Sequence, residues 1–401
     1  MAVIIREVIP DGSQWGIKGE ILRDWSGLEF GQDLKASSSI KFDYPNQGTH
    51  FDKLRTGMYI IVEIDGVSTW NDSIFYVTER SGPLTTLIPG NTQFAGHTLR
   101  KRLEKVKWMP AFGSSYMDSE SFRYTNVTPR DVIKAGVDNY LSRAKSKYGD
   151  PSHWISSVHS SQTWGIRVDE LLPATTSVHD MLVKYQDLGI AAARFEGFML
   201  RVEPYDWMVG STTRDKSDSV QLKAGVNLTE ATYSESNDNV ITALLVKGGA
   251  DPFREAAEGT EIQTNVVQWV TATPEQIRRY GYHEDVLEVG SAVQPSTLQA
   301  IGQNYLRNHM EPKHSTSYTM VDSLYDPRTG ALLPTPQALL DFQCGDSIRV
   351  LQEDGASVEK VFAITLSYEN PTRSEKVGLL LNDYFDSWET TFDQRLKRLG
   401  G

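Results

Sequence analysis

Short β-prone runs separated by turn residues occupy both ends of this chain, and they constrain its fold more than any other feature. From Val3 to about Thr98, five runs follow one another: VIIREV, WGIKGEIL, SSSIKFDYP, MYIIVEIDG and DSIFYVTERSG. In the third run, Ile40, Phe42 and Tyr44 alternate with polar residues, which predicts a strand with one face turned inward. Five strands of this kind predict a small barrel or sandwich.

The C-terminal part of the chain shows the same kind of pattern. Strands are predicted in STSYTMVDSLYDP, FQCGDSIRVLQEDG, VEKVFAITLSYENP and KVGLLLNDYF. The segment from Leu222 to Gly249 has two apolar runs joined by a polar stretch, which predicts a strand, a connection and a second strand. No convincing short sequence repeat is present, but the end of the chain resembles its start in the spacing of strands.

Helices are predicted between these two β-rich regions. In TPRDVIKAGVDNYLSRAKSKYG, Thr128 is a suitable N-cap and Pro129 suits the first helical position. In TTSVHDMLVKYQDLG, Ser177 and Asp180 have the spacing of a capping box, and the runs AAARFEG and FMLRVEP that follow predict a hairpin. Two further helices are predicted in ATPEQIRRYGYHEDVLEVG, ending near Gly281, and in QPSTLQAIGQNYLRNHMEP. The expected organisation is two β domains separated by α+β material.

Composition narrows the class of protein. The chain has 401 residues, of which 39% are hydrophobic, so it can bury a sizeable core in more than one domain. Its single cysteine, Cys344, excludes a disulfide framework and a cysteine-based zinc site. No apolar run approaches the ~20 residues of a membrane span, so we expect a soluble protein made in the cytoplasm. The net charge of −12 opposes adhesion to a nucleic-acid backbone.

Candidate chemical groups are few. A Gly-Asp-Ser tripeptide, present here as Gly345-Asp346-Ser347, carries the nucleophile in some hydrolases. An alternating strand pattern follows it in this chain, so we interpret it as a turn before a strand. Paired carboxylates for glycoside hydrolysis cannot be identified by spacing among 52 acidic residues. We therefore expect no catalytic, cofactor or metal site.

The Ser/His/Trp-rich stretch from Ser152 to Trp164 is the candidate contact site. His153 and His159 lie near Trp154 and Trp164, which makes the stretch a candidate for a metal site, a sugar site or a contact with a partner or the host. Packing or surface roles are the alternative reading for the same residues.

The order of these elements resembles that of siphophage tail hub proteins, including a family of minor tail proteins from phages of actinobacteria, and more distantly the baseplate hub of contractile-tailed phages. Three patterns carry the resemblance: TQFAGHTLRKRLEKVKWMP, with Gly96, Leu99, Leu103 and Pro110; SVHDMLVKYQDLGIAAARFEGFMLRVEP; and the segment from Leu222 joined to IRRYGYHEDVLEV, STLQAIGQNYLRNHMEP and FQCGDSIRVL. They span most of the chain. The loop from Trp108 to Arg123 and the stretch from Ser152 to Trp164 have no counterpart in the family.

The resemblance implies an α+β, mostly β fold with two small β-barrel hub domains. The implied domains are a first barrel at 1–105, α+β insertion domains at 106–215, a second barrel at 216–262 and 315–387, an inserted helix-containing subdomain at 263–314, and a tail at 388–401. It also implies a homotrimer at the tail tip of the virion, forming a pseudo-six-fold ring. The implied partners are the distal tail or tail tube ring proteins, the C-terminus of the tape measure protein, and tip or receptor-binding proteins. Genomic DNA would pass through the ring without specific binding.

Two other function classes compete with this structural reading. One is a tail-associated cell-wall hydrolase, which a digestion assay would detect. The other is a module that binds a host glycan or receptor through Trp154, Trp164 or the loop from Phe112 to Phe122.

Overall fold

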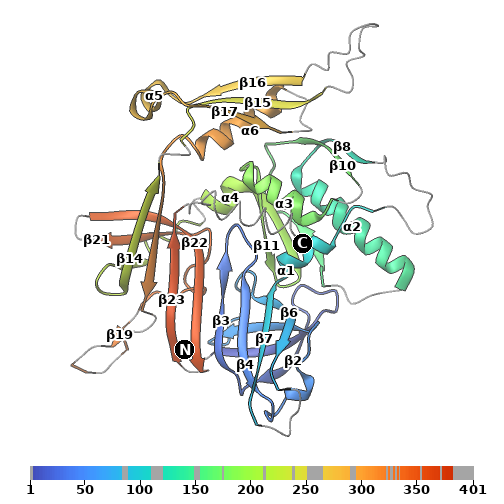
Figure 1. Cartoon of the computed structure of the whole chain (residues 1–401), viewed down its shortest axis with the longest axis vertical. Coiled ribbons are helices and arrows are strands. Elements are labelled where there is room, and N and C mark those ends of the chain that lie inside the picture. The colour runs from blue at the N-terminus through green and yellow to red at the C-terminus, as the bar shows by residue number, and fades with distance from the viewer. Residues whose placement is uncertain are drawn as a thin grey trace.

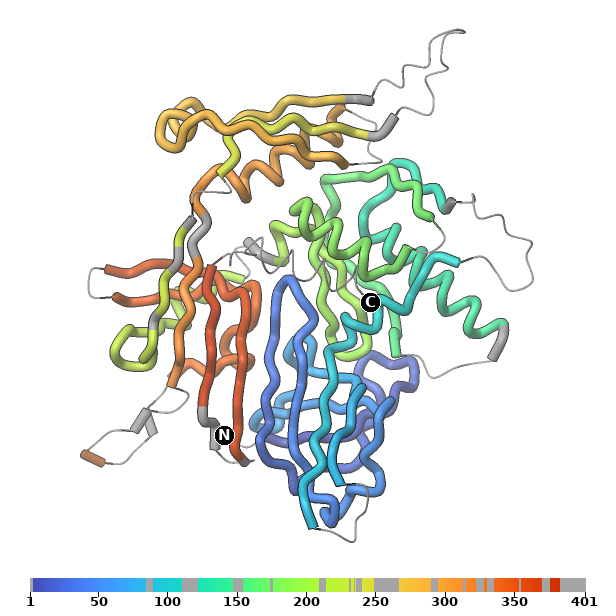
Figure 2. Tube along the Cα trace, viewed as in Figure 1, coloured from blue at the N-terminus to red at the C-terminus, as the bar shows by residue number. Residues whose placement is uncertain are grey.

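The computed structural model describes residues 3–83, 89–109, 121–148, 154–173, 176–210, 214–236, 240–250, 265–289, 295–321, 324–325, 328–329, 332–333, 335–352, 355–370 and 373–382. Figure 1 shows the N-terminal strands and the C-terminal strands standing side by side. The middle of the chain covers one end of the N-terminal strands, and a small sheet with a helix projects at the top (Figures 1 and 2). The fold is α+β and mostly β, as the sequence predicts.

Seven strands and a 3-10 turn form the N-terminal part. They are β1 (Val3–Ile9), β2 (Ile17–Leu22), β3 (Ser26–Asp33), β4 (Ser39–Pro45), η1 (Phe51–Lys53), β5 (Tyr59–Ile64), β6 (Ile74–Ser81) and β7 (Asn91–Thr98). The C-terminal part contains β13 (Gln221–Lys223), β14 (Leu228–Ser236), β18 (Lys313–Met320), β19 (Leu324–Tyr325), β20 (Leu332–Leu333), β21 (Ser347–Gln352), β22 (Gly355–Asn370) and β23 (Arg373–Leu381).

Strands from both parts belong to one sheet of 13 strands. Its path runs β14-β18-β23-β22-β3-β4-β7-β6-β5-β1-β2, and β21 and β13 branch from β22. The two parts meet where β22 pairs with β3. The path is open, and no closed barrel is detected among the described strands, whereas the resemblance implies two small barrels.

A topological repeat underlies this sheet. In the N-terminal part, β3, β4, β7 and β6 are neighbours in that order, and β5 pairs with β6. In the C-terminal part, β14, β18, β23 and β22 are neighbours in that order, and β21 pairs with β22. Each set therefore has the same connectivity, with β3, β4, β5, β6 and β7 corresponding to β14, β18, β21, β22 and β23. The two copies follow each other along the sheet head to tail.

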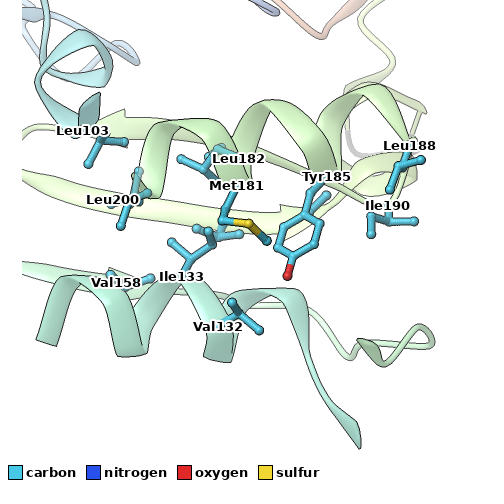
Figure 3. Packing of buried hydrophobic residues seen from close by; sticks show 14 of the residues in the cluster. Leu103, Val132, Ile133, Val158, Met181, Leu182, Tyr185, Leu188, Ile190 and Leu200 are labelled. Atoms are coloured by element: carbon cyan, nitrogen blue, oxygen red, sulfur yellow. The ribbon is translucent and has the colours of Figure 1, made fainter. Parts of the chain in front are cut away.

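The middle of the chain forms an α+β unit. Its elements are α1 (Leu99–Arg102), η2 (Leu103–Lys105), β8 (Ser121–Val127), α2 (Pro129–Tyr148), β9 (Ser157–His159), β10 (Val168–Pro173), α3 (Val178–Asp187), β11 (Ala191–Glu196), β12 (Met199–Pro204) and α4 (Tyr205–Gly210). The predicted capping box is confirmed, because the Ser177 side chain accepts from the Asp180 amide and Asp180 accepts from the Ser177 amide. Figure 3 shows Met181 and Tyr185 of α3 pointing toward α2, in the buried core of this unit.

An inserted subdomain lies between β14 and β18. It contains β15 (Ala243–Ala250), β16 (Asn265–Thr271), α5 (Pro274–Tyr280), β17 (Glu284–Glu288) and α6 (Pro295–Arg307). The two strands expected in Leu222–Gly249 are present as β14 and β15, but they lie in different sheets, because β15 pairs with β16 and β17. The buried residues Leu244 and Val246 of β15 pack in the same core as α6, which explains why β15 belongs with the insertion.

Two large cores result. One fills the N- and C-terminal strands together and includes Phe30, Phe75, Ile348 and Tyr368. The other fills the α+β unit and continues into the insertion through Leu244 and Leu298. Within the described ranges, none of the helices has the length and apolarity that crossing a bilayer requires.

Candidate assembly site

The seam between the two halves of the sheet is an antiparallel pairing of β22 with β3. Its register runs from Ala363↔Asp33 to Tyr368↔Leu28. Apolar side chains close it on the core side, where Phe30 stacks on Tyr368 with ring centroids 6.0 Å apart. Both rings are 1% exposed. The seam is therefore packed like the interior of a single sheet.

Gly31 sets how closely the two strands approach. A Cβ atom added to Gly31 would lie 2.0 Å from the carbonyl oxygen of Ile364. No side chain fits in that space, so this position of β3 requires glycine.

The two repeats match in detail where the glycine before β5 meets the middle of β6 and the glycine before β21 meets the middle of β22. Gly57 and Gly345 both have φ +90°. The Gly57 amide donates to the Val77 carbonyl at 2.8 Å, and the Gly345 amide donates to the Val361 carbonyl at 2.8 Å. Val77 and Val361 in turn donate to the carbonyls of the residues that follow these glycines, at 3.0 and 2.9 Å.

The same irregularity follows in each strand. The register of β6 with β7 shifts between Val77 and Glu79, and that of β22 with β23 shifts between Val361 and Ala363. In both cases the extra residue lies on the first strand of the pair, which is the mark of a β-bulge. Val77 therefore corresponds to Val361, and Glu79 corresponds to Ala363.

Strand pairing extends this correspondence across each repeat. In the N-terminal repeat, one row of paired residues is Val77, Gly96, Ile40 and Phe30. In the C-terminal repeat, the matching row is Val361, Leu381, Thr316 and Tyr233. Phe30 of β3 thus corresponds to Tyr233 of β14.

The corresponding outer edges of the repeats are open. Beyond Val77, β6 pairs only with β7 among the described residues, and Thr78–Ser81 are exposed. In the other repeat, β14 begins the path and pairs with β18 and with no second long strand in the described part of the chain. Tyr233 is 60% exposed, whereas its counterpart Phe30 is 1% exposed. The difference arises because β3 has β22 beside it, whereas none of the described strands occupies the equivalent place beside β14.

Polar groups lock the seam to the α+β unit. The Asp72 amide donates to the Phe195 carbonyl at 2.8 Å, and the Phe195 amide donates to Asp72 Oδ1 at 3.0 Å. Desolvation raises the pKa of the Asp72 carboxyl to about 6, although the hydrogen bond from Phe195 acts in the opposite direction. Gln32 of β3 donates to the Asn71 carbonyl and accepts from the Cys344 amide at 3.1 Å.

The Gly345-Asp346-Ser347 tripeptide is the turn that its sequence predicts. Gly345 has a positive φ, and β21 begins at Ser347. Asp346 forms an ion pair with Arg214 at 3.0 Å and accepts from the Gln343 amide at 2.8 Å. Burial raises the pKa of Asp346, and the nearby Arg214 opposes this rise. These contacts fix the loop before β21 and tie it to Arg214.

The four candidate contact residues do not form one site. Trp154 is 5% exposed, with the guanidinium of Arg102 4.5 Å from its ring centroid. His159 is exposed at the end of β9, and Trp164 is half-buried. His153 lies outside the described residues.

The loop that carries Trp164 folds over a buried carboxylate. Glu203 is fully buried and accepts hydrogen bonds from the hydroxyls of Ser160 and Ser161 at 2.8 and 2.9 Å. Arg201 also donates to it at 2.8 Å. Burial alone would raise the pKa of Glu203, but these hydrogen bonds together outweigh it, so its pKa is lowered. Trp164 donates to Ser160 at 3.0 Å, which fixes its ring.

A cavity of about 330 Å³ lies beside Trp164. Its lining comes from the Trp164 loop, the start of α4 and helix α6, and includes Asp206, Gln303 and Asn304. Arg307 donates to Asp206 at 3.0 Å and to Asn304 at 2.8 Å, close to the lining. Within the described ranges, no group of three His, Cys, Asp or Glu side chains is placed to hold a metal ion.

Sequence reasoning missed the seam and the two open edges. The available signal was the pair of segments TGMYIIVEIDG and CGDSIRVLQEDG, each with a glycine before a strand and Asp-Gly after it. Their apolar positions differ enough that only the matching backbone geometry makes the relation clear.

No protein-family model matches the sequence, and no curated protein matches it. Three solved structures match along almost the whole chain. A tail protein from Neisseria meningitidis is 12% identical, with a TM-score of 0.59, covering 95% of this chain and 96% of its own. The 43 kDa tail protein of a Shewanella oneidensis prophage is 12% identical, with a TM-score of 0.57 and coverage of 96% and 98%. A prophage tail protein from Listeria monocytogenes is 13% identical, with a TM-score of 0.58 and coverage of 100% of both chains. The chain therefore shares the fold of these phage tail proteins.

Proposed function

We propose that the chain is a structural hub protein at the tail tip of a bacteriophage. Three copies would form a ring that joins the tail tube or distal tail ring to the tip. The carrying observation is the repeat within the 13-stranded sheet, whose two copies are joined head to tail and, among the described residues, leave one open edge along β14 and another along β6 beyond Val77. The shared fold with three phage tail proteins supports the same assignment.

A head-to-tail repeat is suited to a ring. A contact that joins one unit to the next by the same rotation each time closes into a cycle when that rotation is a whole fraction of a full turn. Because each chain supplies two units, a trimer supplies six, and it would match a six-fold tube on one side and a three-fold tip on the other. This role needs no catalytic group, and we propose a non-enzymatic protein.

The remaining expectations form part of the proposal. The partners are the tail tube or distal tail ring, the C-terminus of the tape measure protein, and tip or receptor-binding proteins of a siphophage. The domain division suggested by the sequence is retained, with β15 assigned to the insertion because of its pairing. The net charge of −12 suits a ring through which DNA slides without adhesion.

The mass of the purified protein in solution, together with negative-stain class averages, tests this function. We expect three times the mass of one chain and a ring with a central opening and six similar lobes. A chain that stays monomeric at all accessible concentrations, or a closed dimer without an opening, would contradict the hub.

A host contact is a second candidate function, favoured by the cavity beside Trp164. An aromatic ring next to amide and carboxylate side chains is a common arrangement for holding a sugar. We expect Trp164→Ala to weaken binding to host envelope fragments about tenfold while ring mass is unchanged. Trp154→Phe is a control, because Trp154 is buried and has no access to a ligand. Equal binding by the Trp164 variant and the parent would exclude this role.

A further inference from the structure

We infer that the open edge of β6 in one copy pairs antiparallel with β14 in the next copy, and that this pairing places Arg80 opposite Glu235. The inference rests on the proposed ring and specifies its contact. The occupant of both edges is a second copy of this chain, because the chain already contains one instance of the same contact. That instance is the pairing of β22 with β3.

The correspondence of the repeats supplies the template. Because β6 corresponds to β22 and β14 corresponds to β3, a neighbouring copy that continues the sheet must place its β14 against β6. The direction follows as well, since β22 and β3 are antiparallel. The free part of β6 starts at Thr78, after the Val77 backbone has bonded Gly57 and Met58. Likewise, β22 meets β3 only after Val361 has bonded Gly345 and Asp346.

The register follows from counting along matched residues. At the seam, Ile364 is paired with Gln32. Ile364 lies three residues after Val361, as Arg80 lies three residues after Val77. Gln32 lies two residues after Phe30, as Glu235 lies two residues after Tyr233. The equivalent pair between copies is therefore Arg80 and Glu235.

The side chains at these edges fit the register. Arg80 and Glu235 are exposed and carry opposite charges, so the register creates a favourable cross-strand pair. Tyr233 occupies the place that Phe30 has at the seam, so pairing would cover an aromatic ring that is now 60% exposed. The other described side chains of β14 beyond Leu228 are polar and exposed, which suits a contact made chiefly by backbone hydrogen bonds.

Charge reversal tests the pairing, provided that the fold of each variant is checked first, because the Arg80 guanidinium lies 4.7 Å from the ring centroid of Phe51 in the core. We expect Arg80→Glu and Glu235→Arg each to weaken assembly about tenfold or more at low ionic strength, because each places like charges opposite one another. The double variant exchanges the two charges and is expected to recover assembly. Mass as a function of protein concentration is the readout. Arg278→Glu and Glu275→Arg, on exposed α5, are matched controls for the change in net charge.

Disulfide trapping tests the register. Arg80 and Glu235 lie at opposite ends of the eight-strand path within one chain, so a bond between cysteines at these positions must join two copies. We expect Arg80→Cys with Glu235→Cys to give covalently closed trimers on oxidation. Arg80→Cys with Glu230→Cys, five residues out of register, should give none. The parent protein controls for the native Cys344.

The outcomes separate this inference from the proposed function. Cross-linked trimers in the first cysteine pair only, with rescue by the double charge reversal, support the pairing. Trimers in the parent that neither cross-link nor respond to charge reversal overturn the pairing and leave the ring standing. A monomeric parent overturns the ring and the pairing with it.

Discussion

Glycine and buried polar residues determine how the parts of this protein meet. Gly31 brings β3 against β22, and its Cβ position is filled by a backbone atom that cannot move away without separating the strands. Asp72 exchanges two hydrogen bonds with Phe195 and so ties the N-terminal strands to the α+β unit. Neither residue belongs to a recognisable motif, because its role depends on a neighbour more than one hundred residues away.

Replacing Gly31 with alanine tests the seam. We expect Gly31→Ala to lower the free energy of unfolding by about 3 kcal/mol, because the added methyl forces the strands apart. Denaturant unfolding measures the change. Gly165→Ala is the control, since no atom lies within 4 Å of a Cβ placed there. Equal stability of the two variants would show that the seam adjusts freely.

Replacing Asp72 with asparagine tests the joint through its pH dependence. The folded-state pKa of about 6 lies above the ordinary value of 3.8, so the folded protein favours the neutral carboxyl. The stability that this group contributes is fully present below pH 3.8 and is lost as the pH rises through 6. Asp72→Asn keeps an acceptor for the Phe195 amide and removes the ionisation.

We therefore expect the melting temperature of Asp72→Asn, measured relative to the parent, to rise between about pH 4 and pH 7. Differential scanning fluorimetry across this range checks the sign. A difference between the two proteins that is flat with pH would show that Asp72 does not titrate in this range.

At the scale of elements, local signals in the sequence predicted much of the fold. The α3 cap at Ser177, the α2 start at Pro129 and the β11–β12 hairpin are all present, because each depends on residues close together in the chain. The resemblance places β15 in the second barrel, but β15 pairs with β16 and β17 of the insertion. Which strands pair depends on which apolar faces must be buried, and the sequence of one strand does not reveal this.

The candidate contact residues show the same limit. Clustering along the sequence suggested that Trp154 and Trp164 act together, but one is buried beneath Arg102 and the other lies beside a cavity. Their environments depend on β11, β12 and α6, which no local pattern around position 160 encodes. The open edges of β6 and β14 were missed because these strands carry no unusual residues. They become distinctive only by comparison with β22 and β3.

At the scale of the whole molecule, the two repeats are displaced from each other along the strand direction, and this displacement determines how strongly the strands tilt. In the N-terminal repeat, the row of paired residues from Val77 to Phe30 continues across the seam from Phe30 to Leu366. Val361, the residue of β22 that corresponds to Val77, lies five residues before Leu366. The row of paired residues is thus displaced along the strands by about five residues in each four-strand repeat. With about 4.8 Å between neighbouring strands and a rise of about 3.3 Å per residue, six repeats of four strands imply strands tilted by about 40° from the ring axis. In the proposed ring, the same geometry gives a backbone diameter of about 48 Å, which leaves roughly 35 Å between inward side chains. If three copies close into the proposed ring, the slope of one seam determines its bore, and that bore would pass a DNA duplex without unwinding it.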